Sequence, residues 1–283
     1  MVRLQLLICA LCALFVVACG ATGSPTAQPV TPPLRYNLTE PQVTLLSPSV
    51  VQLSGPITPD AVQLVAQTAP QTVTTLRIRS HGGPRLAGLD LADLVRARNW
   101  SVSVYDFCLS GCAHFVLVAG RRRYIEDGAF LLFHQTDSGL IAMMRNHTPD
   151  ATLETYLAGL ERESVLYKES NVDPALLVLP LAALEDICGT LIFDAQGSVV
   201  DLRVRRRMSA AWTGSTRALA SFGLTFEGEV PENVGELQSR LVAVGMYIPT
   251  SSIRFASERR PEQEQAVIAR HMAMPLCSPP LAP

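Results

Sequence analysis

The sequence predicts an α/β fold in which parallel β-strands alternate with outer helices. Two observations support this prediction. Between residues 50 and 134, short runs rich in β-branched residues alternate with segments whose apolar residues recur at helical spacing. Glycine and proline mark several junctions, such as Gly55-Pro56 and His81-Gly82-Gly83-Pro84. Alternation of this kind is typical of βαβ units, whose right-handed crossovers place helices outside a parallel sheet.

The elements of the first half follow from the alternating apolar pattern of strands and the helical spacing of apolar residues. Strands are expected at Val50–Thr58, Thr72–Ser80, Trp100–Phe107, Arg123–Ile125 and Ala129–His134, the last two on either side of an Asp127-Gly128 turn. Helices are expected at Pro59–Thr68, Leu86–Asn99 and Cys112–Ala119. The second of these helices is the clearest, because four leucines and Val95 fall on one face.

The second half of the chain is less regular. An amphipathic helix is expected at Pro149–Ser170, followed by a hairpin over residues 191–207 that turns at Ala195-Gln196-Gly197. The stretch Met208–Leu224 is expected to begin as a loop and to end in a short helix. No pattern assigns a role to the residues after Gly228.

The amino terminus indicates export. Residues 1–19 carry one early positive charge, Arg3, followed by an apolar run that is too short to span a bilayer and suits a signal peptide. The run ends in Val-Val-Ala-Cys-Gly, which resembles a bacterial lipoprotein signal. That resemblance implies lipidation of Cys19, and acyl chains on this residue would anchor the protein to a membrane. The alternative is a plain secreted protein in which this cysteine has no role.

These features divide the chain into four segments. The signal peptide covers residues 1–19, and residues 20–45 form a Pro-, Thr- and Ser-rich flexible linker. The folded domain is expected at residues 46–226, with a C-terminal extension at 227–283. The protein would therefore be exported, periplasmic or in the cell envelope, and lipid-anchored.

Charge and cysteine content narrow the function further. A formal net charge of −2 gives no electrostatic basis for binding nucleic acid. Four cysteines lie outside the leader, and an oxidising compartment permits disulfides among them without showing which pair. These candidates are Cys108, Cys112, Cys188 and Cys277. Their spacing does not favour a metal site, and no motif implies a cofactor.

A serine lies where the third strand meets a helix, in the stretch FCLSGCAHF (residues 107–115). Alone, Ser110 reads as a helix cap. However, the amides and positive dipole end of a helix could also stabilise an oxyanion beside a nucleophilic serine. A base is required to activate the hydroxyl, and His134 at the end of a later apolar strand could supply it. Gly82 and Gly83 lack side chains, so their backbone could approach a substrate carbonyl.

From Val50 to Leu224 the chain resembles the Clp-protease/crotonase superfamily, and within it a periplasmic Clp-protease-like branch. The resemblance depends on five stretches in order, VQLSGPIT, LRIRSHGG, FCLSGCAHFVLVAG, FLLFHQ and, more weakly, MSAAWTGSTRALASFGL. It implies a spiral of βαβ units with a parallel sheet and outer helices. It also implies Ser110 as nucleophile, His134 as base, and oxyanion amides from Gly82, Gly83 and Gly111. The family's orienting aspartate has no evident counterpart, because arginines precede Met208; Asp201 and Asp186 are the alternatives.

These observations predict a membrane-tethered extracytoplasmic serine hydrolase, acting on a peptide or protein substrate. A catalytically silent module that binds peptide or acyl groups in the same cleft is the main alternative. A crotonase-like enzyme for CoA thioesters fits less well, because CoA esters are cytoplasmic while the leader exports this chain. The family forms rings and smaller assemblies, so a homo-oligomer is an open alternative. One of the two cysteines flanking Ser110 could also bond Cys188.

Overall fold

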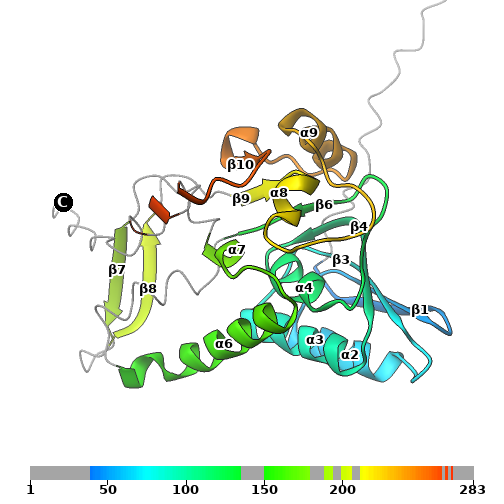
Figure 1. Ribbon diagram of the computed structural model, residues 1–283. Coiled ribbons are helices and arrows are strands. Elements are labelled where there is room, and N and C mark those ends of the chain that lie inside the picture. Colours follow the sequence, from blue (N-terminus) through cyan, green and yellow to red (C-terminus); the bar gives the residue numbers. More distant parts are fainter. Residues whose placement is uncertain are drawn as a thin grey trace, which may run out of the picture. The chain divides into compact units, whose positions relative to one another are not determined.

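The structure, a computed structural model, describes residues 39–134, 150–178, 188–193, 199–205 and 211–262, together with residues 265, 266 and 269. All of them belong to the compact unit Leu34–Pro283. Its main sheet has six strands in the order β1-β2-β3-β4-β5, with β6 also paired to β4 (Figure 1). The strands are β1 (Gln42–Ser47), β2 (Val50–Ser54), β3 (Thr75–Ser80), β4 (Ser101–Leu109), β5 (Arg123–Ile125) and β6 (Phe130–Leu132). Every pairing is parallel except β1 with β2, which confirms the α/β prediction.

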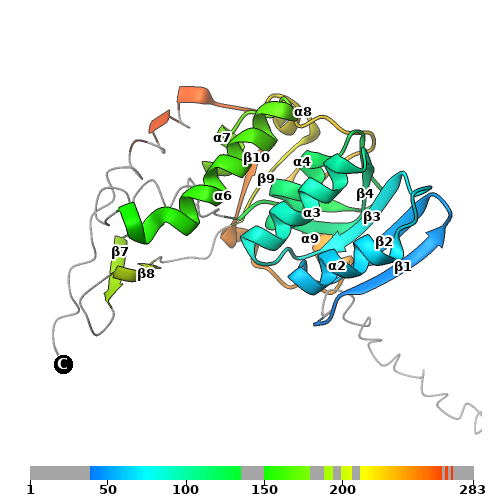
Figure 2. The ribbon, with the colours of Figure 1, turned by 90° about the horizontal axis from the view of Figure 1, so that it is seen from below.

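Helices connect the parallel strands and cover one face of the sheet. They are α2 (Pro59–Thr68), α3 (Arg85–Ala97), the π-helix η1 (Cys112–Val116) and its continuation α4 (Leu117–Ala119). Figures 1 and 2 show α2, α3 and α4 side by side on that face. Six strand residues beneath them are fully buried: Val51, Leu53, Leu76, Ile78, Val102 and Val104. The alternation of apolar residues in these strands therefore faces the helices, as the period of two requires.

The first strand begins before the domain boundary expected at residue 46. Gln42–Ser47 pairs with β2 as an antiparallel edge strand. Its first residues were expected in the linker, because an edge strand with solvent on one side needs no regular apolar pattern. Leu45 and Leu46 are both exposed.

β4 pairs with two strands in succession along its length. Its first half pairs with β5 and its second half with β6, both in parallel. Its register against β3 shifts between Val104 and Cys108, where Asp106 has a φ of +57°. The expected turn at Asp127-Gly128 is present, but the two strands beside it do not form a hairpin, because each pairs with β4 instead.

A second apolar cluster lies against β6 and includes residues expected in the C-terminal extension. β9 (Ala211–Gly214) pairs in parallel with β10 (Ile253–Ala256), and helix α9 (Val234–Ala243) lies close to them (Figure 1). Leu237 and Leu241 of α9 are fully buried in a cluster with Phe107, Phe130 and Leu132. The loop expected after Met208 is thus a strand from Ala211 onward, followed by the short helix α8 (Thr216–Ala220). A four-residue strand is too short to show a period in sequence.

The remaining described elements are α6 (Asp150–Glu169), α7 (Ala175–Val178), the 3-10 helix η3 (Thr250–Ser252) and the antiparallel pair β7 (Cys188–Phe193) and β8 (Val199–Arg205). The helix and the hairpin were both expected. α6 packs on α3, where Arg85 Nε lies 2.5 Å from Glu163 Oε1 in a pair with very little exposed surface. Among the residues that the structure describes, no helix is both long and apolar enough to cross a bilayer.

Candidate functional site

Ser110 occupies the turn between β4 and the π-helix. Its amide donates to the carbonyl of Leu132 at 2.9 Å, and its carbonyl accepts from the amide of His114 at 2.9 Å. Within the described part of the chain, the Ser110 hydroxyl makes no hydrogen bond to a helix amide or to another side chain. The half-buried hydroxyl therefore does not cap the helix, which was the ordinary interpretation of a serine at this position.

The backbone at Ser110 is unusual for its residue type. Four non-glycine residues in the described part have positive φ, and three of them are Asn or Asp, which tolerate this conformation. The fourth is Ser110, with a φ of +52°. A left-handed conformation costs such a residue about 1–2 kcal/mol and persists only where its surroundings hold it. A strained serine on a sharp strand-to-helix turn is the arrangement that exposes nucleophiles in α/β hydrolases.

A disulfide holds the Ser110 turn. Cys108 and Cys112 are bonded to each other, with Cα atoms 5.3 Å apart, and both are fully buried. This corrects the idea that one of them bonds Cys188. Cysteines four residues apart in a regular helix or strand cannot bridge without distortion, but the turn folds the end of β4 back onto the start of the helix. The Cys188 side chain and the whole of Cys277 lie outside the described residues.

Removal of this disulfide is expected to destabilise the protein. For the double substitution Cys108→Ala and Cys112→Ala we expect a loss of about 2 kcal/mol, because the unfolded chain regains the entropy of a short closed loop. Urea unfolding of the wild type and the variant measures the difference. Peptide mapping of the unreduced protein provides an independent check, and a Cys108–Cys188 or Cys112–Cys188 cross-link would contradict the pairing.

The Gly82-Gly83 turn packs directly against Ser110. A Cβ on Gly82 would lie 2.9 Å from Ser110 Cβ, Leu109 O and Gly111 N, and Gly82 has a φ of +89°. A Cβ on Gly83 would lie only 2.0 Å from the carbonyl oxygen of Ile57. The structure thus brings together Gly82, Gly83, Ser110 and Gly111, which the sequence had led us to expect.

The amides of these glycines are not equally available. The Gly82 amide donates to Ser80 Oγ at 3.0 Å in a buried hydrogen bond. The Gly83 amide has no acceptor among the described residues, and Gly83 is exposed. Gly111 contributes one of the first amides of the helix, which have no intrahelical acceptor. Gly83 and Gly111 are therefore better placed than Gly82 to bind an oxyanion.

His134 lies just after β6, the strand whose last residue accepts the hydrogen bond from the Ser110 amide. Leu132, two residues earlier, accepts the hydrogen bond from the Ser110 amide, and the His134 side chain is exposed. The structure shows no hydrogen bond between the Ser110 hydroxyl and the His134 ring within the described residues. His134 does interact with other parts of the protein, and its carbonyl accepts from His114 Nε2 at 2.8 Å.

The strand beside the histidine carries no acid. Phe133 and Trp212 exchange two backbone hydrogen bonds of 2.8 Å, which places β9 alongside the residue preceding His134. β9 consists of Ala, Trp, Thr and Gly, so it supplies no orienting carboxylate. Of the two alternatives from the sequence, Asp201 lies in β8 and Asp186 lies outside the described residues. Within the described part of the chain, no group of three or more metal-ligating side chains occurs.

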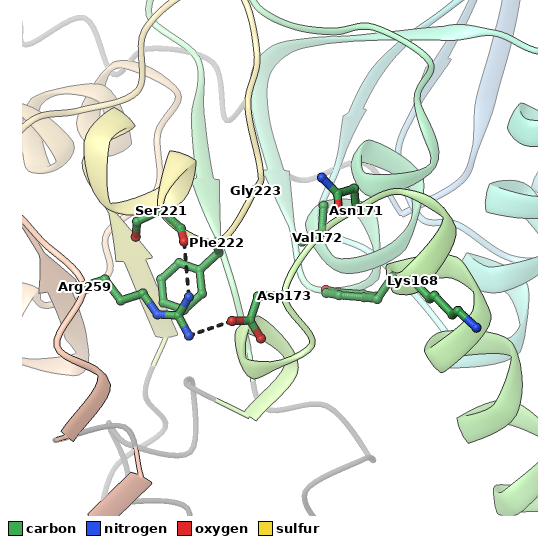
Figure 3. Close-up of a pocket in the computed structure, with 9 residues that line it drawn as sticks. Lys168, Asn171, Val172, Asp173, Ser221, Phe222, Gly223 and Arg259 are labelled. Carbon is green, nitrogen blue, oxygen red and sulfur yellow. Dashed lines mark hydrogen bonds and ion pairs between the residues drawn. The ribbon is translucent and has the colours of Figure 1, made fainter.

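A pocket of about 420 Å³ has neither Ser110 nor His134 among its lining residues (Figure 3). It is lined by the end of α6, the turn after it, the turn after α8, and Arg259. The Arg259 guanidinium carbon lies 4.2 Å from the centroid of the Phe222 ring. Its Nη2 lies 2.6 Å from Asp173 Oδ2, and its Nη1 donates to the Ser221 carbonyl at 3.2 Å. Its charge is therefore balanced within the protein. None of the candidate catalytic residues lines this pocket, so we place the site at Ser110.

The sequence did not indicate one residue of this site. His114 was interpreted as a core residue, and it is buried. Its bond to the carbonyl of His134 joins residues 20 apart, and nothing in the local sequence signals it. Cys19 lies outside the described residues. No protein-family model matches the chain, and no curated protein matches it significantly.

Proposed function

We propose that the protein is a serine hydrolase of the α/β class, with the spiral βαβ arrangement of the Clp-protease/crotonase superfamily. Within that class it would be a membrane-tethered extracytoplasmic peptidase. Ser110 would be the nucleophile and His134 the base, with Gly83 and Gly111 supplying oxyanion amides. The observation that carries the proposal is the Ser110 turn: a strained serine at a helix start, packed against a Gly-Gly turn, whose hydroxyl forms no hydrogen bond with any described residue.

Other features are consistent with this proposal. In acyl transfer, the negative charge develops on the carbonyl oxygen, and amides fixed beforehand stabilise it without reorganisation; one such donor typically contributes about 3 kcal/mol. The disulfide beside Ser110 suits an oxidising compartment, as does the leader that ends at Cys19. A lipid on Cys19 and the linker after it would hold the domain near a membrane, where a peptide or protein substrate could reach it.

Labelling with a fluorophosphonate probe tests the proposal. The purified protein is expected to form a covalent adduct, and Ser110→Ala to abolish it, because the probe bonds only an activated serine oxygen. His134→Ala should suppress labelling as well. Ser215→Ala is a matched control, since Ser215 Oγ caps α8 by accepting from the Ala218 amide at 3.1 Å. This variant should lose about 1 kcal/mol of stability and keep full labelling.

Two observations favour a catalytically silent binding module as the second candidate. β9 supplies no acid to orient His134, and no hydrogen bond links the Ser110 hydroxyl to the His134 ring within the described residues. A missing orienting carboxylate can reduce turnover by about 10⁴. In that case the folded wild type would take up no probe, and the Gly83 and Gly111 amides would hold a peptide or acyl carbonyl without cleaving it.

A further inference from the structure

His114 forms hydrogen bonds with the main chain of both candidate catalytic residues. Its amide donates to the carbonyl of Ser110 at 2.9 Å, and its ring Nε2 lies 2.8 Å from the carbonyl oxygen of His134. The π-helix places its backbone at the Ser110 turn while its side chain extends toward the end of β6. The two candidate residues are 24 positions apart in the chain, and His114 connects their backbones directly.

The hydrogen bonds define the protonation of the His114 ring. A carbonyl oxygen can only accept, so Nε2 must carry the proton and Nδ1 must be the acceptor. The Tyr167 hydroxyl lies 3.4 Å from Nδ1 and can donate to it. Burial lowers the pKa of His114 to about 4, so the ring is neutral at physiological pH. It therefore acts as a fixed donor to the carbonyl of His134 and does not transfer protons.

The surroundings of His114 hold the ring in place. Phe133 packs edge-on against it with ring centroids 5.1 Å apart, and Phe115 lies on another side at 6.0 Å. Phe133 is itself bonded to Trp212 through two backbone hydrogen bonds. Tyr167, on α6, is completely buried. A ring confined in this way can fix the position of the carbonyl that it bonds.

We propose that His114 is a positioning residue for the Ser110–His134 pair, which sets the backbone of the candidate base relative to the Ser110 turn. The inference rests on the proposed function. His134 comes directly after Phe133, whose two backbone hydrogen bonds to Trp212 join this segment to β9, and the bond from His114 is a further constraint on the His134 main chain. Small displacements matter, because a shift of about 1 Å in a catalytic group can reduce a rate by about 100-fold.

Two substitutions separate this role from simple packing. His114→Phe keeps a flat ring but removes the donor, and we expect the rate of fluorophosphonate labelling to fall by at least about tenfold. His114→Gln retains an amide donor near the position of Nε2 and should restore labelling to within about threefold of the wild type. The pH at which the labelling rate reaches half its maximum should change in His114→Phe and stay the same in His114→Gln. If His114 had a purely structural role, this pH would not change in either variant.

Histidine NMR gives a readout that does not depend on activity. In ¹⁵N-histidine-labelled protein, the His114 ring should carry its proton on Nε2, and the His134 ring signals should shift in His114→Phe but not in His114→Gln. If the wild type takes up no probe, the proposed hydrolase fails, and the NMR spectra still decide the positioning role. If His114→Phe does not fold, Tyr167→Phe replaces it, and the His134 signals should then move because Nδ1 loses its donor. A proton on Nδ1 of His114 would overturn the inference. So would His134 ring signals that do not change in His114→Phe, or in Tyr167→Phe where that variant replaces it.

Discussion

Gly83→Ala is expected to unfold the candidate site and to remove covalent labelling. The added methyl group would lie 2.0 Å from the carbonyl oxygen of Ile57, which is backbone and cannot rotate away. The same loop is held by a 2.9 Å hydrogen bond from the Ile57 amide to the Gly82 carbonyl. The two segments must therefore separate, at an expected cost of about 3 kcal/mol or more in the free energy of unfolding. Urea unfolding at pH 7.5 measures this cost.

Gly111→Ala is the matched control for this prediction. It changes the glycine that follows Ser110, and the nearest atoms to its methyl group would be Phe115 Cδ2 at 3.6 Å, the Gly83 carbonyl oxygen at 3.7 Å and Phe115 Cε2 at 3.8 Å, which are ordinary contacts. Its φ of −55° is helical, so alanine fits the backbone. We expect its stability to stay within about 0.5 kcal/mol of the wild type. Equal losses in the two variants would show that the Gly83 turn is not packed as the structure has it.

Stability should fall as the pH is lowered from 7.5 to 5, mainly because of His114. Burial lowers its pKa from 6.5 in the unfolded chain to about 4 in the folded protein. Between these values the unfolded state binds the proton and the folded state does not, so acidification favours unfolding. The expected loss at pH 5 is about 2 kcal/mol. Carboxylates whose pKa is lowered in the fold, such as Glu126, contribute mainly at lower pH, because an ordinary glutamate titrates near 4.5.

Urea unfolding at pH 7.5 and pH 5 tests the assignment. In His114→Gln the difference between the two pH values should largely disappear, since glutamine does not titrate. His81→Gln is the control: the pKa of His81 is also lowered by burial, but the residue is exposed, so we expect its replacement to preserve most of the pH dependence. A pH dependence that His114→Gln leaves intact would assign the effect to other groups.

Much of the candidate site could be predicted from the sequence because its parts are local. A serine at a strand-to-helix junction and a Gly-Gly turn after a strand can both be recognised in the sequence, because each interrupts the regular spacing of apolar residues. β3 and β4 are parallel neighbours whose carboxyl ends meet, which explains why the Gly82-Gly83 turn after β3 contacts Ser110 after β4. The role of each residue is a separate question, which labelling has to decide.

By itself, the sequence determined the order of strands and helices from β2 to β6, and the burial of alternating residues such as Leu76 and Ile78. Side-chain periods of two and 3.6 are properties of the local backbone, so they can be read along the chain. The pairing of Cys108 with Cys112, the bond from Gly82 to Ser80, and the link from His114 to His134 were decided only by the tertiary structure. Each of these depends on the distance and direction between particular atoms. These distances and directions are determined by the turns and crossovers of the folded chain, so they cannot be predicted from the order of residue types alone.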